Sequence, residues 1–176
     1  KIHFVVEEAC EGLTGVSSSQ IEINANIQFY DGITTKDIQH VLVKSANDLI
    51  SLENPNYQYA AARLLSYDVR KEAHGQYEYI PLLKLILRNI KLGVYDRTIV
   101  EKYHKSEIKK LNTWIKRDRD LDFTYAGLRQ VVDKYLVQDR STGELYETPQ
   151  DMYMMIAATL FANYPKEDRM YYVRRY

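Results

Sequence analysis

Residues 34–50, "TTKDIQHVLVKSANDLI", contain a helix start signal that is followed by a single apolar stripe. Thr34 and Asp37 form the capping pattern that satisfies free N–H groups in the first turn of a helix. Apolar and small side chains then recur at helical spacing, at Ile38, Val41, Leu42, Ser45, Leu49 and Ile50. The stretch therefore predicts a capped helix with one buried face.

Stripes of the same kind lie on both sides of this helix. They predict further helices over residues 1–13, 57–71, 80–93 and 149–164. One or two polar helices are expected over 98–117, and a helix over 125–135. Glycine and proline number only 7 and 4 in the 176 residues, which suits a helix-rich chain. We expect an all-α fold.

Two stretches depart from this pattern. "QIEINANIQF" at 20–29 alternates apolar and polar residues as a strand does, yet Ser17 and Gln20 form a second capping pattern. "YLVQDRSTGELYETPQDMYMM" at 135–155 predicts a small β-hairpin, with turn residues between residues 136–137 and 145–146. Two strands alone are marginally stable, so this hairpin is expected to rest on helices as a structural corner.

Charge and cysteine content exclude several classes of protein. Lys plus Arg and Asp plus Glu number 24 each, which argues against a general nucleic-acid binder. The single cysteine, Cys10, cannot form an internal disulfide or a cysteine-based zinc site, and we expect it in the core. The sequence contains no apolar run long enough for a membrane span, and a cytoplasmic protein is expected.

No catalytic motif is present, and no metal is expected to bind this chain itself. One set of residues that forms no recognised motif could hold a phosphate. Thr35 begins a helix, where free N–H groups favour anions, and Gln39 follows one turn later. Lys1 and Lys71 also lie at helix ends. The same residues can also be explained without a ligand, as helix caps and surface lysines.

Several long motifs resemble the large subunit of class I aerobic ribonucleotide reductase. "RDRDLDFTYAGLRQ", "KYLVQDRSTGELYETPQ" and "ATLFANYPKEDRMYYVRRY" resemble its helical domain, and "IQFYDGITTKDI", "PNYQYAAARLL" and "RKEAHGQYE" resemble its N-terminal ATP-cone. The resemblance runs from Lys1 to Tyr176. It implies a partial ATP-cone over 1–75 and the start of the helical domain over 76–176.

The resemblance implies an enzyme that reduces ribonucleoside diphosphates to deoxyribonucleotides. Its catalytic α/β barrel is expected beyond Tyr176, so this segment alone is expected to be inactive and to be part of a longer chain. Implied partners are the small (beta) subunit, a second large subunit in a homodimer, and nucleotides, without nucleic acid or a membrane. Implied effectors are ATP and dATP with Mg²⁺, of which dATP suppresses activity by shifting subunit assembly.

The family's phosphate contacts fall on Lys1, Thr35 and Lys71. The same three residues were singled out above because they lie at helix ends. The family commonly has a histidine at the position of Gln39, and an amide can donate a hydrogen bond but cannot become charged. The β-hairpin that covers the base in the family is expected before Lys1. The resemblance also makes residues 17–29 a helix.

Polar faces of the first cone helices form subunit contacts in the family. This makes Glu7, Glu11, Glu22 and Asn26 candidates for assembly. Other readings remain open, namely a stand-alone cone-like regulatory or interaction module and a generic helical adaptor. A cone-bearing transcriptional repressor would need a zinc ribbon, which one cysteine excludes.

Overall fold

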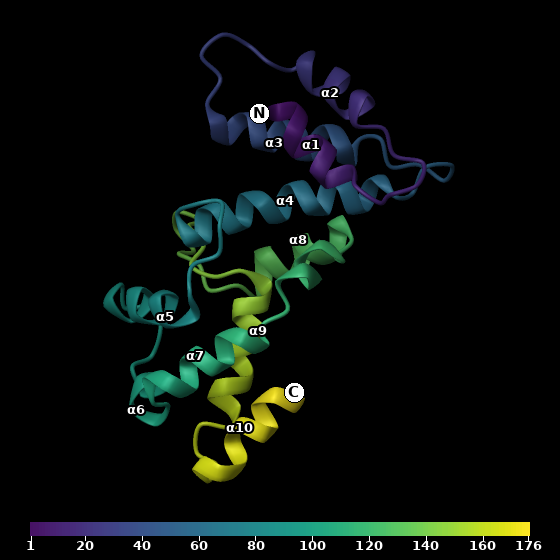
Figure 1. Cartoon of the computed structure of the whole chain (residues 1–176). Coiled ribbons are helices and arrows are strands. Elements are labelled where there is room, and N and C mark those ends of the chain that lie inside the picture. Colours follow the sequence, from purple (N-terminus) through teal and green to yellow (C-terminus); the bar gives the residue numbers. More distant parts are fainter. The chain divides into compact units, whose positions relative to one another are not determined.

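The computed structural model describes residues 1–176 and is helical, which confirms the all-α class. None of its helices combines the length and apolar character needed to span a bilayer. The elements, labelled in Figure 1, are α1 (Ile2–Cys10), α2 (Ser18–Asn26), α3 (Thr35–Asn47), α4 (Tyr57–His74), α5 (Leu82–Lys91), α6 (Thr98–Lys102), α7 (Lys105–Trp114), η1 (Arg117–Leu121), α8 (Tyr125–Lys134), α9 (Pro149–Leu160) and α10 (Lys166–Arg175).

The chain forms two compact units that interleave along the sequence. The first consists of Lys1–Val69 with Asp118–Lys134, and the second of Arg70–Arg117 with Tyr135–Tyr176. Helix α4 therefore begins in the first unit and ends in the second. The division of the sequence at residue 75 into a cone and a helical domain stays a prediction.

In the first unit, α2 packs against both α1 and α3. Its start is fixed by Ser17, whose hydroxyl accepts a hydrogen bond from the Gln20 amide at 3.3 Å. Ile21 and Ala25 are fully buried, whereas Ile23 is 60% exposed. The helical spacing of buried residues thus prevails over the strand-like alternation, and the helix implied by the family resemblance is confirmed.

Helix α3 has the capped start that its sequence predicts, with the Thr34 hydroxyl accepting from the Asp37 amide at 3.1 Å. Leu42, Ser45 and Ala46 face inward from it. Helix α4 contributes a buried face that contains Leu64 and the small side chains of Ala60 and Ala61. Small side chains on α4 allow neighbouring side chains to pack close to its backbone.

In the second unit, α5 packs against α7, and α10 packs against both α7 and α9. The core of this unit consists mainly of aliphatic side chains, including Leu82, Leu85, Ile86, Ile108, Leu111, Ala157 and Val173. Trp114 is partly buried and packs against this core. The buried face of α5 follows the expected apolar stripe.

The predicted hairpin is present only as one isolated antiparallel bridge, between Gln138 and Leu145. The Tyr146 amide does donate to the Val137 carbonyl at 3.1 Å, so the two arms lie side by side. The Leu145 amide, however, donates to the Glu72 carboxylate at 3.2 Å instead of extending a ladder. The segment is a corner of the second unit.

The tip of this corner depends on a glycine. Gly143 has φ +78°, a left-handed conformation that residues with a Cβ rarely adopt. Its amide donates to the Asp139 carbonyl at 2.7 Å, and the Asp139 side chain accepts from the Ser141 amide at 2.7 Å. The turn chemistry of the sequence is therefore realised, even though regular strands are not.

Candidate functional site

The start of α3 carries the first candidate phosphate ligand. Thr34 caps the helix, and its hydroxyl also donates to the Asp37 carboxylate at 2.7 Å. Thr35 is the first helical residue and its side chain is exposed. Because Thr34 already serves as the cap, the hydroxyl of Thr35 is not needed for that role. It lies where the positive end of the helix dipole favours an anion.

Gln39 lies one turn further along α3 and is half-buried. Its Nε2 donates to the Leu64 carbonyl of α4 at 2.7 Å. The next residue, His40, has its Nε2 3.5 Å from the Asp68 carboxylate, also on α4. Gln39 therefore ties α3 to α4, and only the second N–H of its amide could also serve a phosphate in this rotamer.

Lys1 and Lys71 are both exposed. Lys1 occupies the N-cap position of α1 and makes no side-chain cap. Lys71 lies in the last turn of α4. Lys1, Thr35 and Gln39 belong to the first unit and Lys71 to the second. A common site for all four residues therefore stays a prediction.

The polar surface of α1 and α2 includes a three-residue charge cluster. His3 Nδ1 lies 2.8 Å from the Glu22 carboxylate, and His3 Nε2 lies 3.2 Å from Glu7. The hydrogen bond to Glu22 and the charge of Glu7 raise the pKa of His3. Of the proposed assembly residues, Glu7 and Glu22 are thus both paired with His3 within the chain. The exposed Glu11 accepts a hydrogen bond from Arg63 through its backbone carbonyl at 2.6 Å. Asn26 is exposed at the end of α2.

Cys10 is half-buried at the end of α1, so it is less enclosed than the core position that we expected. Burial raises the pKa of its thiol to about 11. The thiol is therefore protonated at neutral pH, and a thiol of this kind is a poor nucleophile.

The second unit contains a buried polar network around Asp151. Its carboxylate accepts from the Thr148 amide at 3.1 Å, which caps α9, and lies 2.6 Å from the Arg117 guanidinium. His74 Nε2 lies 2.9 Å from the same carboxylate, and the Ile80 amide donates to His74 Nδ1 at 2.9 Å. Nδ1 is therefore the acceptor, and Nε2 carries the hydrogen that is donated to Asp151.

A second buried carboxylate fixes the hairpin-like corner. Glu147 is 1% exposed, accepts from the Val137 amide at 2.9 Å, and receives a short hydrogen bond from the Tyr95 hydroxyl. Burial raises the pKa of Glu147 and also that of Tyr95. The Asn89 amide group donates to the Tyr146 carbonyl at 2.9 Å. These bonds hold the corner against α5 and the loop that follows α5.

Sequence reasoning missed both buried networks. The Thr148-x-x-Asp151 spacing is a capping pattern and could have identified the α9 cap. Nothing in the sequence links Asp151 to His74, or Glu147 to Tyr95. No group of three or more His, Cys, Asp or Glu side chains is arranged to hold a metal ion. The Asp151 network joins α4 to α9, and the Glu147 network joins the corner to the loop that follows α5.

Comparisons with known proteins identify the family. A family model described as "ATP cone domain" matches residues 1–72, and one described as "Ribonucleotide reductase, all-alpha domain" matches residues 121–176. The chain is 48% identical over 176 residues to ribonucleoside-diphosphate reductase 1 subunit alpha of Escherichia coli. It is 43% identical over 176 residues to subunit alpha of Haemophilus influenzae, and 42% over 178 residues to that of phage T4.

Each of these alignments covers 100% of this chain and 23% of the relative, so the chain spans about a quarter of the length of these relatives. The motifs that resembled a reductase large subunit therefore lie in alignments that cover the whole of this chain. The chain belongs to the ribonucleoside-diphosphate reductase alpha-subunit family, in which it corresponds to the N-terminal ATP-cone and all-alpha region.

Proposed function

We propose that this segment is the regulatory N-terminal part of a large subunit that reduces ribonucleoside diphosphates to deoxyribonucleotides. The match of residues 1–72 to the ATP-cone family is the observation that carries the proposal. The reduction itself needs the rest of the large subunit. We further propose that the complete enzyme is cytoplasmic and contains two large subunits together with the small subunit.

The effectors proposed for the cone are ATP and dATP, each bound with Mg²⁺. The start of α3 offers exposed Thr35 and backbone N–H groups to a phosphate, and Lys1 and Lys71 supply positive charge. The Asp37 carboxylate in the same turn repels an anion, so the positive charges of the lysines are needed to offset this repulsion. Gln39 contributes at most one further donor, because its other N–H is bonded to Leu64.

The test uses the full-length large subunit and measures the shift in its thermal unfolding midpoint with saturating ATP or dATP. Ligands that bind only the folded state raise this midpoint. We expect Lys71→Ala and Thr35→Ala each to reduce the shift at a fixed nucleotide concentration. Lys102→Ala, which removes an exposed lysine of α6, is the matched control and should leave the shift unchanged.

Two outcomes would contradict the proposal. One is the absence of any nucleotide-induced shift in the unaltered protein. The other is a full shift in both Lys71→Ala and Thr35→Ala, which would leave the cone without the phosphate contacts that we assign. Assembly is tested separately by sedimentation with and without dATP, where Glu7→Lys and Glu11→Lys are expected to alter the dATP-dependent species.

A further inference from the structure

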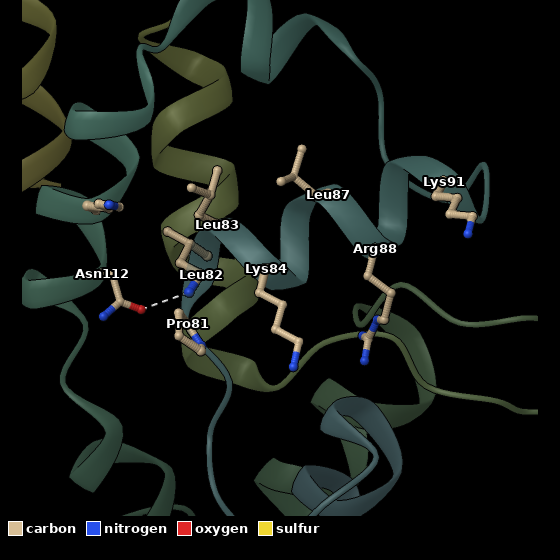
Figure 2. Close-up of a pocket in the computed structure, with 9 residues that line it drawn as sticks. Pro81, Leu82, Leu83, Lys84, Leu87, Arg88, Lys91 and Asn112 are labelled. Atoms are coloured by element: carbon tan, nitrogen blue, oxygen red, sulfur yellow. Dashed lines mark hydrogen bonds between the residues drawn. The ribbon is translucent and has the colours of Figure 1, made fainter.

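A groove of about 750 Å³ runs along the outer side of α5 in the second unit. Figure 2 shows that Leu83 and Leu87 project to one side of α5, whereas Lys84 and Arg88 project to the other. Leu87 is 47% exposed, although the opposite face of the same helix is fully buried through Leu82 and Leu85. Leu87 therefore adds apolar surface outside the core-facing stripe, whereas Leu83 is half-buried and also packs against the core of the second unit.

The charge in this groove has a single sign. Lys84, Arg88 and Lys91 lie at i, i+4 and i+7 along α5, and Lys109 joins them from α7. None of the nine lining residues is acidic. Since the whole chain has formal net charge +0, this concentration of cations is a local feature. Seven residues of helix correspond to a length of roughly 10 Å, which is two turns.

One of these cations is held in place by the protein itself. The Arg88 guanidinium donates to the Asn89 side chain at 3.0 Å and to the Tyr146 carbonyl at 3.1 Å. The floor of the groove is also fixed, because the Leu82 amide at the start of α5 donates to Asn112 of α7 at 2.8 Å. A preorganised surface loses less conformational entropy on binding.

We propose that this surface, the α5 groove (Leu83, Lys84, Leu87, Arg88, Lys91 and Lys109), docks an acidic amphipathic helix of a partner protein. The apolar side of that helix would pack on Leu83 and Leu87. Carboxylates at i, i+4 and i+7 would pair with the row of three cations on α5. The apolar row favours a protein segment over a nucleic acid, whose phosphate backbone offers only charge along such a surface.

The test uses the full-length large subunit and a fluorescein-labelled peptide of about sixteen residues that carries leucine on one helical face and glutamate on the other. A scrambled peptide of the same composition is the ligand control. Binding is followed by fluorescence anisotropy. We expect micromolar affinity that falls as salt is raised, and at least about tenfold weaker binding of the scrambled peptide.

Two variants test the two halves of the surface. Lys84→Glu/Lys91→Glu is expected to weaken binding about tenfold or more, and Leu87→Ser several-fold, because charge pairing and apolar burial are removed separately. The matched control is Lys102→Glu/Lys105→Glu, which changes the net charge equally at exposed lysines outside the groove and should bind as the unaltered protein does.

Equal binding of the ordered and scrambled peptides, or equal binding by all variants, would overturn the proposal. So would tighter binding of duplex DNA or of phosphatidylglycerol vesicles with the same dependence on Lys84 and Lys91, because the surface would then recognise a nucleic acid or a lipid. The α5 groove shares no residue with the nucleotide contacts proposed above. Loss of the nucleotide-induced shift would therefore not affect this result.

Discussion

The buried imidazole of His74 donates to the Asp151 carboxylate at 2.9 Å and so joins the last turn of α4 to the first turn of α9. Both side chains have 0% exposed area. The carboxylate is also bonded to Thr148 and paired with Arg117. One side chain thus fixes a helix start, a helix end and a connecting segment that are far apart in the sequence.

Replacing Asp151 with Asn is expected to lower the local free energy of opening around α9 by about 3 kcal/mol. The change removes the charge that pairs with Arg117, whose side chain is only 20% exposed, and leaves that cation without its buried partner. Hydrogen–deuterium exchange of α9 amides in the full-length protein measures the effect. Asp48→Asn, which alters an exposed ion pair with Lys44, should change exchange by less than about 0.5 kcal/mol.

The Asp151 carboxylate also predicts an acid-dependent loss of stability. Burial alone would raise its pKa, but the His74 hydrogen bond and the Arg117 charge outweigh burial and hold the pKa below its ordinary value. The resulting stabilisation is complete above the unfolded-state pKa of about 3.9 and is lost as the pH falls through the folded-state pKa. The difference in thermal midpoint between the unaltered protein and Asp151→Asn should therefore shrink below about pH 4. A difference that stays constant down to pH 3 would contradict this assignment.

Tyr95→Phe is expected to destabilise the hairpin-like corner by about 1–3 kcal/mol, because buried Glu147 loses a hydrogen-bond donor and cannot recover it from water. Exchange of the amides in residues 136–147 is the measurement. Tyr30→Phe removes the same hydroxyl from a side chain that is 62% exposed, and it should leave exchange unchanged. Equal protection of the corner in both variants would mean that the Tyr95 hydroxyl does not hold it.

Local patterns in the sequence located most of the helices but not the contacts between distant side chains. Capping at Thr34 and the stripe that follows it specify α3 because both signals act within a few residues. The strand-like alternation at 20–29 was ambiguous because Ile23 and Ile27 are exposed apolar residues, which periodicity cannot distinguish from buried ones. Helix α10 was not predicted, since its mostly polar sequence buries only Arg169 and Val173.

The candidate site was predictable to a similar extent. The helix start at Thr35 follows from its neighbours, so its exposure could be expected. The bond from Gln39 to the Leu64 carbonyl joins residues that are 25 positions apart, and it depends on how α3 packs against α4. The pairing of Glu147 with Tyr95 could not be predicted either, because the two residues are 52 positions apart and meet only through the packing of the second unit. Packing at long range, rather than helix formation, decides these contacts.

Gln39→Leu is expected to weaken the attachment of α3 to α4 by about 1 kcal/mol or somewhat more, because the Leu64 carbonyl loses its side-chain donor. Gln39→His is the informative partner variant, since an imidazole N–H can donate to the same carbonyl and can also become charged. Exchange of α3 amides measures both effects. We expect Gln39→His to retain more protection than Gln39→Leu. The reverse order would show that the amide acts through packing and not through the Leu64 hydrogen bond.

His3 is expected to titrate above the ordinary histidine value of about 6.5, because the Glu22 hydrogen bond and the Glu7 charge favour its protonated form. The stabilisation that this gives to the α1–α2 contact is complete below the unfolded-state pKa and is lost as the pH rises through the folded-state pKa. The rate of imidazole C2–H exchange against pH, followed by mass spectrometry, gives the pKa of this residue. Glu22→Gln should lower it toward the ordinary value, whereas Glu53→Gln, an exposed change elsewhere in the first unit, should not. An unaltered pKa in Glu22→Gln would mean that the His3–Glu22 contact at 2.8 Å does not govern the protonation of His3. Titration of His3 would then not change the strength of the contact between α1 and α2.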